Sequence, residues 1–305
     1  MMKHRLVYGV TLAIAALAGL LYLPLVGAFA VFAILTILLM KEFYGLFKVA
    51  DPPFPIFDRI GIVCGLALMT AAFLDSIPPF SRRLDVLSLD SAERFVVFLS
   101  IAVVMVRQFP QKHNQQPLMT IAGTLFGIFY VAYLLTFLLR LGIEFDPNVR
   151  WNRPMGETGR FLLFYLLAVV KAGDSGALFV GCRWGRHKLF PRISPNKSWE
   201  GLVGGMAVGT VAGLLLFYLL GQPVTPVLRE FGRLRWSVAD ALAMGLILTA
   251  AGAIGDLVES LIKRAVAVKD SGRVIPGLGG LLDVFDSVLY TAPILYFYTT
   301  ARLLW

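Results

Sequence analysis

Long apolar segments separated by short polar stretches run through the chain from end to end. A helix needs about 20 mostly apolar residues to cross a bilayer, within a range of roughly 17–25, and by that rule we expect about nine spans. They are Leu6–Leu23, Val26–Met40, Gly61–Leu74, Phe95–Val106, Leu118–Leu139, Phe161–Val180, Leu202–Leu220, Ala239–Gly255 and Ser287–Leu304. The pattern therefore predicts an all-α, polytopic integral membrane protein.

Composition supports this interpretation and excludes most others. The 305 residues are 58% hydrophobic and 15% charged, whereas soluble domains carry about 25% charged residues. The two cysteines, Cys64 and Cys182, lie in or beside apolar segments, so no disulfide framework is indicated. The net charge of +9 includes no long basic tract outside the apolar segments. We therefore attribute it to cytoplasmic loops and anionic lipid, not to a nucleic-acid partner.

Lysine placement suggests an orientation. With the N-terminus in the cytoplasm and nine spans, every lysine except Lys171 falls on the cytoplasmic side. The arginines divide more evenly between the two sides. This arrangement puts the basic loop Arg183–Glu200 and the segment Lys263–Asp283 on one face, where we expect them to form a single site.

One charged cluster lies inside the sixth expected span. An ionised side chain at the bilayer centre costs about 2.5–3.5 kcal/mol on insertion scales. Lys171 and Asp174 are three residues apart, so on a helix they share a face and can pair. The pair could join packed helices, but we favour a site lining because Gly173 and Gly176 permit close approach of a ligand or of another helix.

A second cluster is the basic segment Gly181–Glu200. Within it, Ser194-Pro-Asn-Lys-Ser-Trp-Glu-Gly201 leads directly into the next expected helix. A hydroxyl, a lysine and backbone N–H groups at the start of a helix can hold a phosphate. The alternative is an ordinary basic loop beside the membrane. We interpret His187 as a surface residue.

A third cluster precedes the last span. Asp256, Glu259, Ser260 and Lys263 have spacings that place them on one helical face. Magnesium prefers a few carboxylate oxygens and keeps other positions for water and phosphate, and nearby cations would stabilise phosphate charge in a transition state.

The start of the last span repeats this pattern with Asp283, Asp286 and Ser287. The alternative interpretation is a set of interfacial charges and helix caps. Carboxylates this close repel one another unless a cation lies between them, which favours a metal site.

At these residues the chain resembles a known family. The run Ser260-x-x-Lys263-Arg264-x4-Lys269-Asp270, continued by Pro276-Gly277-x-Gly279-Gly280-x-x-Asp283-x-x-Asp286, resembles the signature of phosphatidate cytidylyltransferases, also called CDP-diglyceride synthases. The segment Phe190–Gly201 and the tripeptide Asp174-Ser175-Gly176 are similar to two further hallmarks. The resemblance is strong over about Lys171–Ser287, while in the first five spans only hydropathy agrees.

The resemblance implies a function. It implies transfer of CMP from CTP to phosphatidic acid, which gives CDP-diacylglycerol and pyrophosphate for phospholipid biosynthesis. It also implies a magnesium requirement, leaves open an accompanying monovalent cation, and suggests a homodimer in the bacterial inner membrane with its active site on the cytoplasmic side. We expect residues 1–160 to form the N-terminal membrane helices and residues 161–305 the catalytic helices with two cytoplasmic motif loops.

The resemblance also implies residue roles, carried over by position. Asp256 and Asp283 correspond to metal ligands. The implied catalytic residues are Asp256, Lys263, Arg264, Lys269, Asp283 and Asp286. The implied substrate-binding residues are Lys171, Asp174, Ser194, Lys197, Ser198 and Arg273.

Two positions depart from the family pattern. Leu278 stands where the family usually has histidine, and Val284 where it has arginine. The attacking phosphate oxygen is already anionic at neutral pH, so the reaction needs no general base, and nucleotidyl transfer depends mainly on positioning and electrostatics. Arg273 could supply the missing cation.

Three alternatives remain open. A CTP-dependent lipid-alcohol kinase would release CDP in place of pyrophosphate. A transporter would use Lys171 and Asp174 on an ion pathway. A catalytically degenerate homologue would bind nucleotide without turnover.

Overall fold

A computed structural model describes residues 23–50, 55–77, 89–112, 114–146, 152–220, 236–268, 271–272 and 280–304. Of the first expected span, only Leu23 is described, and Lys269, Arg273 and Leu278 lie outside the described residues. Each of the other eight expected spans falls within described helices. The prediction of a helical protein is therefore confirmed for this part of the chain.

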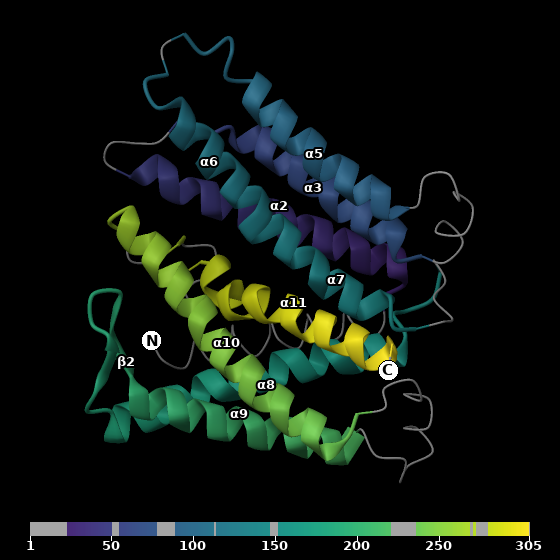
Figure 1. Ribbon diagram of the computed structural model, residues 1–305, viewed down its shortest axis with the longest axis vertical. Helices are drawn as coiled ribbons and strands as arrows, with labels where there is room; N and C mark the ends of the chain where they lie inside the picture. The colour runs from purple at the N-terminus through teal and green to yellow at the C-terminus, as the bar shows by residue number, and fades with distance from the viewer. Residues whose placement is uncertain are drawn as a thin grey trace. The chain divides into compact units, whose positions relative to one another are not determined.

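The elements follow one another in a simple order (Figure 1). They are α2 (Leu25–Val49), α3 (Asp58–Asp75), α5 (Leu89–Val106), α6 (Pro117–Gly127), the π-helix η1 (Ile128–Tyr133), α7 (Leu134–Ile143), α8 (Glu157–Trp184), β1 (Lys188–Phe190), β2 (Ser194–Ser198), α9 (Trp199–Leu220), α10 (Val238–Ala265) and α11 (Leu282–Leu304).

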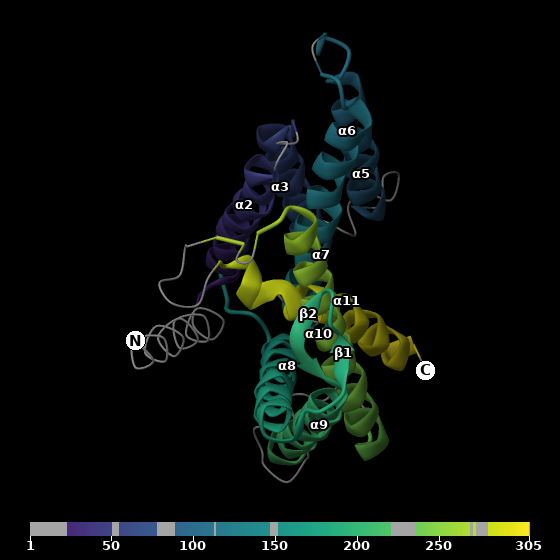
Figure 2. The ribbon, with the colours of Figure 1, turned by 90° about the vertical axis from the view of Figure 1, so that its left-hand side faces the viewer.

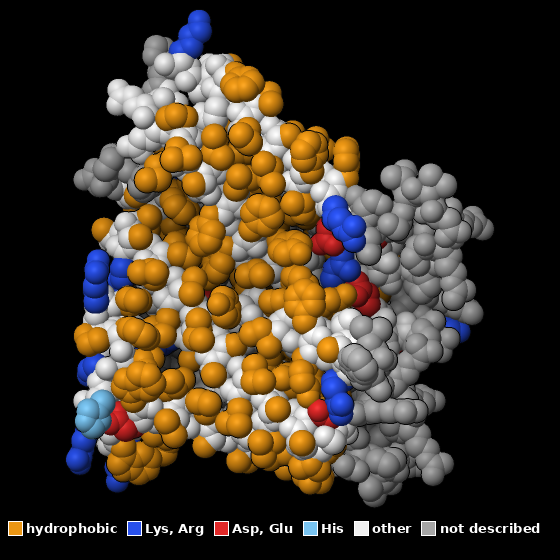
Figure 3. Space-filling model, in the orientation of Figure 1, with side chains coloured by type: hydrophobic (Ala, Val, Ile, Leu, Met, Phe, Trp, Pro, Cys, Tyr) orange, Lys and Arg blue, Asp and Glu red, His pale blue; other side chains and the backbone are white. Residues whose placement is uncertain are grey.

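Several helices are suited to a bilayer. Among the described residues, five helices are long and apolar enough to cross a membrane; the count of about nine is not confirmed. They are Leu25–Val49, Pro117–Ile143, Glu157–Trp184, Trp199–Leu219 and Val238–Ala265. Apolar side chains cover much of the face shown in Figure 3, and on α9 the side chains of Val203, Val211 and Leu219 are each more than 60% exposed. Such surface is what lipid tails would cover.

The chain forms two compact units. One contains Met1–Met155 with Lys263–Val284, and the other contains Gly156–Ile262 with Phe285–Trp305. The functional division expected at residue 160 is a separate statement and stays a prediction.

In the first unit, α2 and α3 pack with α5 and with the continuous helix α6–η1–α7 (Figures 1 and 2). Tyr44 of α2 is fully buried and donates a hydrogen bond of 2.8 Å to the carbonyl oxygen of Thr124. Its ring fits because Gly61 and Gly127 have no side chain: an added Cβ would lie 2.1 Å and 2.4 Å from Tyr44 atoms.

A buried charge cluster also joins helices of this unit. The Arg140 guanidinium of α7 forms ion pairs with Asp75 of α3, Glu93 of α5 and Glu144. The side chains of Arg140 and Asp75 are only 10% and 6% exposed. Removing one partner from such a buried network leaves uncompensated charge, which is strongly destabilising. The cluster therefore fixes how α3, α5 and α7 pack.

In the second unit, small residues hold α8 and α9 close together. A Cβ on Gly205 would lie 2.8 Å from the Gly173 carbonyl oxygen, and one on Gly201 would lie 2.9 Å from that of Ala177. Small residues spaced in this way let membrane helices approach closely. Gly173 also faces Thr249 of α10, and Gly176 faces Val208 of α9. The close approach predicted at these two glycines is therefore used by other helices.

The segment expected to be a loop contains a β-hairpin. Strand β1 pairs antiparallel with β2, with Lys188 opposite Ser198 and Phe190 opposite Ser194. Figure 2 shows the hairpin beside the ends of α8 and α9. The expectation that Ser194–Ser198 begins a helix is corrected, because α9 begins at Trp199. Pairing between strands that are separated by a turn leaves little signal in either strand alone, which is why the sequence did not reveal it.

Gly205→Ala tests the close packing of α8 and α9, with Gly45→Ala as the matched control. Both changes gain about 1 kcal/mol of helix propensity. Only the Gly205 variant places a methyl group against backbone, since a Cβ on Gly45 meets nothing within 4 Å. Overpacking costs about 1–3 kcal/mol. Denaturant titration in detergent should find the Gly205 variant less stable than the Gly45 variant by about that amount; equal stabilities would contradict the close packing.

Candidate functional site

Three carboxylates meet in the second unit. Asp256 and Glu259 lie one turn apart on α10, and Asp286 lies near the start of α11; each offers an oxygen within 4.8 Å of the others. Glu259 and Asp286 are buried, with 1% and 4% of their surface exposed, and Asp256 is partly exposed. The two helices approach closely because Gly255 has no side chain: a Cβ there would lie 2.9 Å from the Asp286 carbonyl oxygen.

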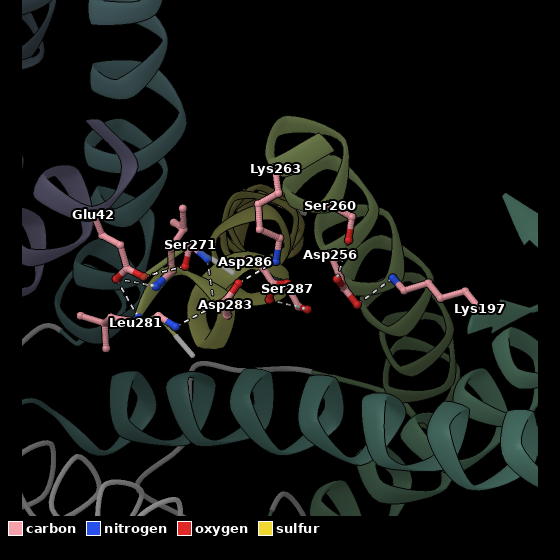
Figure 4. A network of polar contacts seen from close by, with 12 residues as sticks. Glu42, Lys197, Asp256, Ser260, Lys263, Ser271, Leu281, Asp283, Asp286 and Ser287 are labelled. Atoms are coloured by element: carbon pink, nitrogen blue, oxygen red, sulfur yellow. Dashed lines mark hydrogen bonds and ion pairs between the residues drawn. The ribbon is translucent and has the colours of Figure 1, made fainter. Parts of the chain in front are cut away.

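This donor set fits a hard divalent cation. Three carboxylates in a poorly solvated place repel one another strongly, and a cation between them removes that repulsion. Magnesium takes carboxylate oxygens and retains positions for water and phosphate. An Asp286 oxygen also accepts a hydrogen bond of 3.0 Å from the Ser287 hydroxyl, which orients the carboxylate. Figure 4 shows Asp256, Asp286 and Ser287 within this network.

A lysine from the hairpin reaches the same cluster. Lys197 of β2 lies 2.7 Å from an Asp256 oxygen and donates to the Ala253 carbonyl oxygen at 3.2 Å. The Ser260 hydroxyl lies 3.5 Å from the other Asp256 oxygen. The Lys197 and Asp256 side chains keep 24% and 38% exposure, so they are open to a ligand. The hairpin therefore brings a cation beside the carboxylates (Figure 4).

Asp283 has a different set of partners, all in the first unit. Lys263 lies 2.6 Å from one Asp283 oxygen. The other oxygen accepts the Gly280 N–H at 2.7 Å and the Ser271 N–H at 3.4 Å. The structure thus groups Asp256 with Glu259 and Asp286, and gives Asp283 to a lysine and two backbone donors. The assignment of Asp256 and Asp283 as the metal ligands stays a prediction.

The remaining expected site residues lie in known places. Lys171 and Asp174 form the i,i+3 pair expected on α8, at 3.2 Å, and both are partly exposed. Ser198 is buried, and its oxygen accepts the Gly201 N–H at 3.1 Å, which caps the start of α9. Ser194 begins β2 and Arg264 lies in the last turn of α10. Lys269 and Arg273 are outside the described residues.

Two acidic residues were not assigned from the sequence. Glu259 stands on the predicted face of α10, so its spacing from Asp256 was the available signal. Glu42 of α2 accepts hydrogen bonds from the Ser271 hydroxyl and the Leu281 N–H. The only signal for Glu42 was a charge in a mostly apolar segment, which often marks a functional residue. Its partners are more than 200 positions away in the chain, so the sequence could not name them.

Comparison with known proteins agrees with the signature. Residues 3–301 match the cytidylyltransferase family. A relative from Haemophilus influenzae, named phosphatidate cytidylyltransferase, is 31% identical over 306 residues, which cover 98% of this chain and 99% of the relative.

Two further relatives match over a shorter region. A protein from Bacillus subtilis with the same name is 42% identical over 145 residues, 48% of this chain and 49% of that protein. The uncharacterized protein YnbB of Escherichia coli is 37% identical over 142 residues, 47% of this chain and 43% of that protein. These matches therefore span about half the length of the two relatives. Because the family match extends over nearly the whole sequence, this chain belongs to the cytidylyltransferase family.

Proposed function

We propose that this protein transfers CMP from CTP to phosphatidic acid, giving CDP-diacylglycerol and pyrophosphate. The observation that carries the proposal is the cluster of Asp256, Glu259 and Asp286, with Lys197 beside it, in a chain that belongs to the cytidylyltransferase family. The name of the Haemophilus influenzae relative, which this chain matches from end to end, supports the choice of lipid substrate.

The carboxylates would hold magnesium, and the ion would neutralise the triphosphate and the departing pyrophosphate. Asp256, Glu259 and Asp286 supply the hard oxygen ligands that this ion prefers. Asp283, one turn before Asp286 on α11, stays a further candidate ligand. A monovalent cation beside magnesium also remains a prediction.

The basic residues would bind and orient phosphate. Lys197 is close enough to the carboxylates to contact a phosphate bound there, and the roles of Lys171, Lys263 and Arg264 remain as expected from the family. An oxygen of the lipid phosphate attacks the α-phosphorus of CTP. The new P–O bond forms as the bond from the α-phosphorus to its bridging oxygen breaks, and that oxygen leaves with pyrophosphate. No proton has to move, so the histidine replaced by Leu278 is not required.

The finer arrangement in the membrane belongs to the same proposal. We propose about nine transmembrane helices, with the acidic cluster at the cytoplasmic face of a bacterial inner membrane and with two copies forming a homodimer. The five described helices that are suited to span a bilayer and the bacterial relatives support an integral membrane protein.

Product analysis separates the proposal from its rivals. Purified full-length protein, given CTP, phosphatidic acid and magnesium, should form CDP-lipid and pyrophosphate in equal amounts. A lipid-alcohol kinase would instead release CDP when offered a polyprenol. Nucleotide binding without either product would indicate a degenerate homologue, and ion flux without nucleotide consumption would indicate a transporter.

Asp286→Asn tests the acidic cluster, with Asp58→Asn as the matched control. The first change removes one of the three clustered carboxylates and should lower kcat by on the order of a hundredfold or more. It should also raise the magnesium concentration needed for half-maximal activity. Asp58 pairs with Lys48 on α2, away from the cluster, so its variant should keep wild-type activity. Equal activity and magnesium dependence in the two variants would exclude a catalytic metal at Asp286.

Lys197→Met tests the hairpin lysine, with Lys48→Met as its control, because each lysine pairs with one aspartate. Loss of a positioned cation should lower kcat/KM for CTP by on the order of a hundredfold. Steady-state kinetics with CTP varied at saturating lipid would measure this. If Lys197→Met is no worse than Lys48→Met, then Lys197 has no part in phosphate binding.

A further inference from the structure

Glu42 is a buried carboxylate whose hydrogen-bond partners all lie at the signature segment. It belongs to α2, a helix apolar enough to span a bilayer, and only 8% of its surface is exposed. One oxygen accepts the Ser271 hydroxyl at 2.6 Å. The other accepts the N–H groups of Leu281 at 2.7 Å and Leu282 at 3.2 Å. All these donors are neutral, so the contacts act through hydrogen-bond acceptance.

The same short backbone stretches hold Asp283. Ser271 donates its hydroxyl to Glu42 and its N–H to Asp283. The N–H of Gly280 goes to Asp283, while that of the next residue, Leu281, goes to Glu42. The two carboxylates therefore share both ends of the segment that runs from Ser271 to Leu281 (Figure 4). A shift of Glu42 would move the donors that orient Asp283.

Glycine at two of these positions makes the contact possible. A Cβ on Gly280 would lie 1.4 Å from a Glu42 oxygen, and one on Gly272 would lie 2.6 Å from the same oxygen. Leu282 is also the first residue of α11, where N–H groups lack partners within the helix. Glu42 accepts one of these, and a negative charge is favourable at a helix N-terminus.

We propose that Glu42 is a positioning residue for the reaction. It fixes the two ends of the Ser271–Leu281 segment and the start of α11, and through them the orientation of Asp283. This inference rests on the proposed function for its kinetic consequence, but the contacts themselves do not. It gives the N-terminal half of the chain, where the family resemblance is weak, a specific part in the chemistry.

Substitution of Glu42 by methionine and by glutamine separates acceptance from bulk. Glu42→Met keeps the length of the side chain but leaves the Leu281 and Leu282 N–H groups without their acceptor. Glu42→Gln keeps one oxygen for these N–H groups, and its amide can donate to the Ser271 hydroxyl oxygen. Small displacements at an active site cost up to about a hundredfold in rate. We therefore expect kcat to fall about ten- to hundredfold in Glu42→Met and to stay within about threefold of wild type in Glu42→Gln.

Two further variants show whether an effect is specific. Tyr44→Phe removes another buried hydrogen bond of α2, to Thr124, and should leave kcat near the wild-type value. Ser271→Ala removes a single donor to Glu42 and should lower kcat severalfold, which keeps the proposal testable if Glu42→Met does not fold. The proposal is overturned if Ser271→Ala and Glu42→Met both keep wild-type kcat, or if Tyr44→Phe loses as much activity as they do.

Amide hydrogen exchange tests the contacts without relying on activity. Exchange at Leu281 and Leu282 should be faster in Glu42→Met than in wild type or Tyr44→Phe, and near normal in Glu42→Gln. If wild-type protein makes no CDP-lipid, the proposed function fails while this measurement still decides the contacts. Unchanged exchange in Glu42→Met would overturn the positioning role even in an active enzyme.

Discussion

Carboxylates buried beside apolar helices must be compensated, and this constraint shapes every charged feature of the protein. Isolated charge is costly away from water, so each buried acid needs donors, a cationic partner or a metal ion. Glu42 has three neutral donors, and Asp283 has a lysine and two N–H groups. The acids near Arg140 share its guanidinium. Asp256, Glu259 and Asp286 are three acids in one place, and a divalent cation is the natural compensation for them.

Close packing within the second unit makes this cluster possible. Gly255 lets α10 approach the first turn of α11, so that carboxylates from two helices can meet. Gly201 and Gly205 let α9 lie against α8, and the hairpin between these helices carries Lys197 to Asp256. The glycines contribute no chemistry of their own. They set the distances at which the acids and the lysine can act on one ligand.

The sequence predicted the helices well because apolar length is a local property. It also predicted the Lys171–Asp174 pair, since that pair depends only on helical spacing. The hairpin was missed because its strands are short and define each other by pairing. The metal pair was drawn from the signature as Asp256 and Asp283, but the structure clusters Asp256 with Glu259 and Asp286. The partners of Glu42 were beyond reach, because no local pattern links α2 to residues near the C-terminus.

The central claim is that a divalent cation is held among Asp256, Glu259 and Asp286. The most direct measurement is a crystal structure of the full-length protein soaked in manganese, with anomalous scattering used to locate the ion. The account predicts an anomalous peak within coordination distance of oxygens from these three residues, lost in Asp286→Asn and kept in Asp58→Asn. A peak that lies elsewhere, or no peak at manganese concentrations that support activity, would contradict it.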